Sequence, residues 1–218
     1  APNPFTNTYL AVSCLYLTAL DGVKYAVNCG KTPDELLKEL SKTAGEDADY
    51  LQKEREYRCE KNVFEDYTQE ERDAVFGKPP ATVWENVKIM KENPDKVAVL
   101  TQGDGISDAI VDSFVAGIVY RWENELIDRL IPDTEAAVKR YKKLIHEDEL
   151  DEERWDSISA KRIELIKDGR HKKCICTKLK EALKRKDYDM ASNLQREMVR
   201  KTEALGEEYR TYALNIID

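Results

Sequence analysis

The stretch 179-LKEALKRKDYDMASNLQREM-198 joins two helical patterns at Asp187-Tyr188-Asp189, with no glycine or proline between them. Apolar and small residues recur at helical spacing on both sides of that turn. They are Leu179, Ala182 and Leu183 before it, and Tyr188, Ala191, Leu194 and Met198 after it. The Asp187 carboxylate is suited to cap the second helix. The stretch therefore predicts a tight antiparallel helical hairpin.

The hairpin lies in the basic part of an acidic chain. Residues 170–201 carry eleven Lys and Arg residues against four acids, whereas the whole chain has a net charge of −8. Such an asymmetry predicts a basic C-terminal segment, residues 170–218, after an acidic body, residues 1–169. The alternative is that the basic segment simply completes the bundle and neutralises the acidic body within the same chain.

The rest of the chain also has helical signals. Charged residues make up 36% of the sequence and turn formers are few, with 9 Gly and 7 Pro. Thr-x-x-Glu capping boxes begin at Thr32, Thr68 and Thr82, each ahead of a helical pattern. The run 96–100 (KVAVL) is a candidate strand, or equally the start of a helix. We therefore expect an all-α helical bundle of roughly six helices followed by the hairpin.

Two apolar runs predict buried helices. The run 8–27 (TYLAVSCLYLTALDGVKYAV) is interrupted by Asp21, whereas a membrane span needs about 20 apolar residues. We expect a buried helix there and no membrane segment. Between Ile106 and Ile131 apolar residues fall on nearly every helical face. That pattern predicts the central helix of the bundle, ending before Pro132.

Composition limits the function classes. A net charge of −8 argues against a general nucleic-acid or membrane-surface protein, since such proteins usually carry a cationic excess. Five cysteines in a chain long enough to fold without staples favour reduced thiols and a cytoplasmic location.

Acidic side chains on the apolar helix suggest a metal site. Carboxylates at Asp104, Asp108, Glu125 and Asp128 would suit Mg²⁺ or Mn²⁺ in an all-α nucleotide hydrolase. The alternative is a solvated helix face, because such spacings recur by chance in a chain with 43 acidic residues. No Gly-x-x-x-x-Gly-Lys loop, Gly-x-Ser-x-Gly elbow or His-Glu-x-x-His pattern occurs, and we expect no cofactor.

Two cysteines follow a lysine cluster. Cys174 and Cys176 are separated by one residue, a poor spacing for zinc, and no second cysteine pair accompanies them. A zinc site there is therefore not expected. The neighbouring lysines predict lowered thiol pKa values and reactive cysteines.

The hairpin resembles the UVR motif, which ends the excision-repair proteins UvrB and UvrC and occurs in Clp-type ATPase linkers and the McsA adaptor. The matching residues are Leu179, Ala182, the Asp187-Tyr188 turn, Ala191, Leu194 and Glu197, within about 30 of the 218 residues. In that family the hairpin mediates protein contacts, often by pairing with a second UVR hairpin. Repair or kinase-adaptor roles do not carry over, because the preceding residues match none of these proteins.

The sequence thus favours a non-enzymatic adaptor that binds an acidic protein or a second copy of itself. The expected contact residues are Leu179, Leu183, Lys184, Arg185, Tyr188, Ala191, Leu194 and Met198. The other hypothesis is the metal-dependent nucleotide hydrolase. A third, nucleic-acid binding by the basic segment, is disfavoured because the acidic body would repel phosphate.

Overall fold

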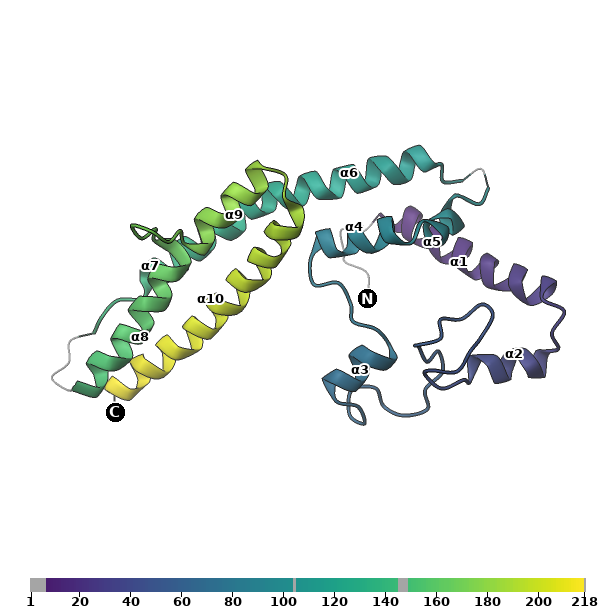
Figure 1. Ribbon diagram of the computed structural model, residues 1–218, viewed down its shortest axis with the longest axis horizontal. Helices are drawn as coiled ribbons and strands as arrows, with labels where there is room; N and C mark the ends of the chain where they lie inside the picture. Colours follow the sequence, from purple (N-terminus) through teal and green to yellow (C-terminus); the bar gives the residue numbers. More distant parts are fainter. Residues whose placement is uncertain (1–6, 104, 145–148, 218) are drawn as a thin grey trace. The chain divides into compact units, whose positions relative to one another are not determined.

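The computed structural model describes residues 7–103, 105–144 and 149–217, and it is all-α (Figure 1). Within these ranges no residue is in a strand. The predicted fold class, an all-α helical bundle, is confirmed. The candidate strand at 96–100 is helical: α5 (Pro94–Ala98) begins at a proline, and a 3₁₀ turn, η1 (Val99–Thr101), continues it.

The chain forms two compact units. Unit 1 comprises the described residues of Ala1–Pro80 and Met90–Val111, and unit 2 those of Ala81–Ile89 and Asp112–Asp218. One division falls between Pro80 and Ala81, and the other two fall within α4 (Val83–Glu92) and α6 (Asp108–Glu125). The basic segment after Gly169 belongs to unit 2 together with residues 112–169. The structure thus divides the chain at other positions than the charge pattern does.

Unit 1 contains α1 (Thr8–Asn28), α2 (Pro33–Leu40), α3 (Gln69–Val75), α5 and η1. The capping boxes expected at Thr32 and Thr68 are both complete. At Thr82, in unit 2, half of the box forms: the Glu85 N–H donates to Thr82 Oγ1, but the Glu85 carboxylate accepts from the N–H of Ala81. Local capping chemistry therefore sets these helix starts.

The expectation of a buried helix at 8–27 is wrong. None of the residues of α1 is buried, and Tyr9, Tyr16 and Val27 are 88%, 74% and 76% exposed. Judged by length and composition alone, α1 is long and apolar enough to cross a membrane. The apolar run marks a helix correctly, but the described residues of unit 1 leave its outer side uncovered.

Unit 2 holds the bundle. A π-helical turn, η2 (Leu126–Leu130), links α6 to α7 (Ile131–Arg140), and α8 (Glu149–Ile166), α9 (Ile175–Lys184) and α10 (Tyr188–Ile217) follow. Pro132 does not end the helix as expected. The N–H of Ile131 donates to the carbonyl of Leu126, so the wider turn accommodates the proline ring and its missing donor.

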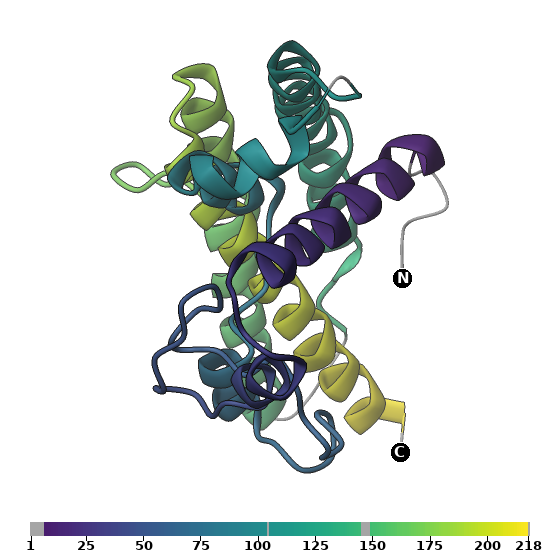
Figure 2. The same ribbon diagram turned by 90° about the vertical axis from the view of Figure 1, so that its right-hand side faces the viewer.

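The predicted hairpin is present: α9 and α10 run antiparallel and lie side by side (Figures 1 and 2). Helix α8 contacts both of them, and α7 packs on α8. The core of unit 2 is drawn from all four helices and from α6, with Trp122, Val138, Ile158, Leu179 and Leu205 among its members.

Helix α6 is not the buried centre that its sequence predicts. Ile110, Phe114 and Tyr120 are 43%, 48% and 65% exposed, and its buried residues are Trp122 and Glu123 near its C-terminal end. Apolar residues on every face indicate a buried helix only if other helices surround that helix. Most of α6 is not surrounded in this way.

Candidate interaction site

The hairpin turn is closed by a left-handed residue that is not glycine. Lys186 has φ of 58°, and its N–H donates to the carbonyl of Leu183 while the N–H of Asp187 donates to that of Ala182. These two bonds form a Schellman motif. Asp187 then caps α10 by accepting from the N–H of Met190 at 3.1 Å, as the sequence predicts. These two caps close the turn without the glycine that usually occupies the left-handed position.

A buried carboxylate explains why a lysine occupies that strained position. Lys186 Nζ lies 2.7 and 2.8 Å from the carboxylate oxygens of Glu123, which is only 8% exposed. Burial by itself would raise the pKa of Glu123, but hydrogen bonds from Lys186 and Tyr188 outweigh it and hold that pKa below its usual value. The turn is therefore fastened to the end of α6 by a charge-assisted contact.

Two tryptophans hold the first residues of α10. The ring centroid of Tyr188 lies 4.8 Å from that of Trp84 and 6.0 Å from that of Trp122. Trp84 Nε1 donates to Asp189 at 3.1 Å, and Trp122 Nε1 donates to Gln195 at 2.8 Å. Tyr188, expected to contact a partner, is thus engaged within its own unit.

The apolar residues expected to contact a partner are in the core. Five of the predicted contact residues are buried, with exposures from 0 to 7%: Leu179, Leu183, Ala191, Leu194 and Met198. They pack against other core residues of unit 2, so the folded unit does not present them on its surface. Only Lys184 and Arg185, of the predicted set, are exposed.

The basic residues of the hairpin segment fall into two groups. The first group is neutralised by acidic side chains of the same chain and comprises Lys172, Lys173, Lys180, Lys186, Arg196 and Lys201. The second group is exposed and, within the described part of the chain, makes no ion pair. On α9 and its C-cap it comprises Lys178, Lys184 and Arg185.

These three residues form what we call the α9 cationic face. Lys178 and Arg185 are seven positions apart and so lie on nearly one line of the helix, while Lys184 projects roughly 100° around the helix from Arg185. Glu181, the acid between them, is already paired with Lys173. Lys178 was not among the contact residues predicted from the sequence, although its spacing from Arg185 was a readable signal. Nothing in the sequence indicated the roles of Glu123 and the tryptophans.

A groove of about 560 Å³ follows α10 on another side of unit 2. Its lining carries both charge signs, because Arg196, Glu197, Arg200 and Glu203 all contribute to it. Arg196 is paired with Glu85 across 3.0 Å. The groove lacks the apolar lining and convergent polar groups typical of a small-molecule site.

Among the described residues, Asp108 lies far from the other carboxylates expected to hold a metal. Asp104 lies outside the described residues. Asp108 opens α6 and Glu125 closes it, so about 25 Å of helix axis separate them. Glu125 is paired with Arg129, and Asp128 is exposed. In the described part of the chain no three His, Cys, Asp or Glu side chains are placed to hold a metal ion.

The two cysteines of the hairpin segment make structural contacts within unit 2. Cys174 caps α9, its sulfur accepting from the N–H of Thr177 at 3.4 Å, while Cys176 is buried with its sulfur 3.8 Å from that of Met198. Burial raises the pKa of Cys176 to about 12. The expectation of a lowered thiol pKa is therefore wrong for Cys176, because the nearby Lys180 is turned to Glu135 and burial dominates.

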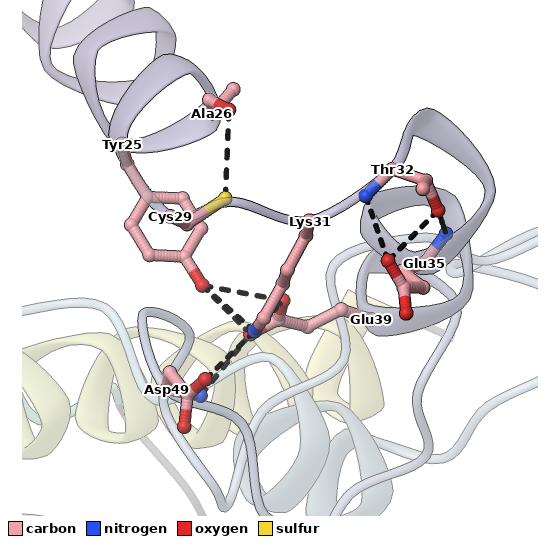
Figure 3. A network of polar contacts seen from close by, with 8 residues as sticks. All are labelled: Tyr25, Ala26, Cys29, Lys31, Thr32, Glu35, Glu39 and Asp49. Carbon is pink, nitrogen blue, oxygen red and sulfur yellow. Dashed lines mark hydrogen bonds and ion pairs between the residues drawn. The ribbon is translucent and has the colours of Figure 1, made fainter.

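Unit 1 has a polar cluster (Figure 3) beside a small pocket lined largely by apolar residues, among them Leu36, Leu40 and Leu51. Lys31 Nζ donates to Glu39 and Asp49 at 2.8 Å each and to the Tyr25 hydroxyl at 3.0 Å. These contacts hold Lys31, just ahead of α2, against the ends of α1 and α2 and the loop that follows α2. The adjacent pocket measures about 230 Å³, below the roughly 300–1,000 Å³ of ordinary ligand sites.

No family model, curated protein or solved structure matches this chain.

Proposed function

We propose that the protein is a non-enzymatic interaction protein whose α9 cationic face binds an acidic segment of a partner protein. The observation that carries this proposal is that three exposed cations, which make no ion pair among the described residues, lie together on α9 and its C-cap. Six other basic residues of the segment are paired with acids of the chain, whereas Lys178, Lys184 and Arg185 are exposed without such a pair in the described structure.

The rigidity of the hairpin supports the proposal. The caps at Lys186 and Asp187 and the Lys186–Glu123 contact fix the end of α9 from which Lys184 and Arg185 project. Cations held on a rigid element lose less entropy on binding than cations on a loop. The resemblance to the UVR motif agrees with a protein-binding role, although the contact proposed here is made by charges and not by the buried apolar face.

The five free cysteines, two of them buried, support the proposed cytoplasmic setting, in which thiols stay reduced. An acidic protein segment is preferred over nucleic acid because the chain as a whole is negative, with a net charge of −8. A long polyanion would extend beyond the face and meet that negative field.

The test is binding of a labelled octaglutamate peptide to the full chain, followed by fluorescence anisotropy at low salt. Arg185→Glu should weaken binding about fivefold, the effect of roughly 1 kcal/mol for an exposed charge contact. Arg200→Glu is the matched control, since Arg200 is also exposed and belongs to α10. It should leave the affinity within about twofold.

Three results would contradict the proposal: no peptide binding, an equal loss in both variants, or tighter binding of single-stranded DNA of matched charge. The second would indicate a response to net charge alone, and the third would favour nucleic acid.

A further inference from the structure

The outward side of α1 is an uncovered apolar surface. We call it the α1 apolar face. Its residues are Tyr9, Val12, Leu15, Tyr16, Leu20, Val23 and Val27, which are between 42% and 88% exposed. On a helical projection they fall in one arc that runs along the whole helix and contains no charged residue. A surface of this kind on a folded protein marks an interaction site.

The opposite side of α1 is attached to its own unit. Asp21 accepts hydrogen bonds from the hydroxyl of Tyr50 and from Gln102, and Lys24 Nζ donates to Gln102 at 3.1 Å. Tyr25 stacks on Tyr50 with ring centroids 4.3 Å apart. These contacts fix which side of α1 faces outward, so the apolar face is a property of folded unit 1.

The spacing and area of the face suit a second helix of the same kind. Tyr9, Val12, Tyr16, Ala19 and Val23 alternate by three and four positions, the repeat by which two helices pack along a seam. Tyr9 and Tyr16 alone expose on the order of 300 Å². With the five aliphatic residues the area approaches the roughly 800 Å² per partner of a standard interface.

Charge favours a second copy over a lipid surface. Unit 1 has nineteen acidic residues against twelve basic ones, so anionic lipid would repel it. Helices that lie in a membrane interface carry Lys and Arg beside their apolar face, whereas α1 has Lys24 as its one basic residue. An uncharged face adds no repulsion when two acidic units meet along it.

We infer that the α1 apolar face is a homodimer interface, in which two copies of this chain pack α1 against α1. A self-complementary contact of this kind is the usual arrangement of a two-fold dimer. The α9 cationic face belongs to unit 2 and contributes no residue to this interface.

The experiment is sedimentation equilibrium of the full chain in reducing buffer over a range of concentrations. The wild type should reach twice the monomer mass of 25.1 kDa. Tyr16→Glu should stay at the monomer mass, because it places a charge at the centre of the seam. Thr18→Glu is the matched control: Thr18 is exposed on the other side of α1, and this variant should dimerise like the wild type.

Circular dichroism verifies that both variants are folded, which is expected because both positions are exposed. A monomeric wild type at the highest concentration would overturn the inference, as would a dimer that persists in Tyr16→Glu. A third measurement is flotation of the protein with phosphatidylcholine vesicles. Binding of the wild type to these vesicles, abolished by Tyr16→Glu, would also overturn it, because the face would then be a lipid contact.

Discussion

Units 1 and 2 both contain apolar helices, but they are held together by different interactions. The core of unit 2 includes side chains with almost no exposed surface, such as Leu126, Ile158, Leu179 and Met198. Among the described residues of unit 1, Ile106 is the one hydrophobic side chain that is buried, at 6% exposure. Its apolar residues lie on the surface instead, most of all on α1.

Polar contacts take the place of a core in unit 1. Lys42, 6% exposed, donates to the carbonyls of Lys53 and Arg55, and Lys31 joins Glu39 to Asp49. Each hydrogen bond of this kind contributes only about 1 kcal/mol net, because water satisfies the same groups in the unfolded chain, whereas apolar burial supplies most of the free energy that favours folding. The comparison indicates that unit 2 is stable by itself and that unit 1 gains stability when its apolar face is covered.

The largest expected effect is in the core of the hairpin. Leu179→Ala should lower the free energy of unfolding of unit 2 by about 3 kcal/mol, because a fully buried leucine loses its burial and leaves a cavity. Urea unfolding followed by tryptophan fluorescence measures this, since Trp84, Trp122 and Trp155 all belong to unit 2.

The matched variant in unit 1 is Leu37→Ala, at a leucine that is 50% exposed. It should change the stability of unit 1 by less than about 0.5 kcal/mol, measured by hydrogen exchange of α2. Equal losses from the two substitutions would remove the contrast between the units.

In unit 1, a polar substitution should destabilise the fold more than an apolar substitution does. Lys42→Ala removes two charge-assisted bonds that hold the loop after α2, and we expect a loss of about 2 kcal/mol in that unit. Hydrogen exchange of residues 43–55 reports it. Lys38→Ala, at an exposed lysine of α2, should have no comparable effect. Unchanged exchange in Lys42→Ala would show that the polar contacts do not hold this unit.

A smaller, pH-dependent effect is expected at Glu123. Its pKa is lowered in the folded state, so its contact stabilises the fold fully above the ordinary carboxyl pKa and is lost as pH falls through the lower, folded value. At neutral pH, Glu123→Gln should lower the free energy of unfolding by about 1 kcal/mol. At acid pH the variant and the wild type should be equally stable, because the wild type has lost this contact as well. Urea midpoints at the two pH values measure the difference.

Glu207→Gln, at an exposed carboxylate of α10, is the control and should leave the pH dependence unchanged. Glu164 and Asp189 also have lowered pKa values, so part of the wild-type acid destabilisation should remain in Glu123→Gln. A pH dependence identical to that of the wild type would exclude a role for the Lys186–Glu123 contact.

Features that depend on neighbouring residues were predictable from the sequence. Thr32, Thr68 and Asp187 cap their helices as expected, because a cap needs only a side chain and the N–H three residues later. The hairpin was predictable for the same reason. Lys186 was not, since a left-handed lysine is stabilised here by Glu123, a residue 63 positions away.

Features that depend on what packs against a helix face could not be predicted from the sequence. The apolar patterns of α1 and α6 identify helices, but periodicity does not say what lies against each face. The hairpin has the opposite outcome: its apolar residues, expected at a partner interface, are covered by α8 and the other core helices. Cys176 follows the same rule, since its depth in the core and not the adjacent lysines decides its pKa.

The most direct test of the central comparison is hydrogen exchange of the full chain, resolved by peptide, at two protein concentrations. We predict that α9 and α10 exchange slowest and independently of concentration, whereas α1 and α2 exchange much faster at low concentration and become protected at high concentration. Equal protection of both units at both concentrations would contradict the account, because unit 1 would then be stable without a core or a partner.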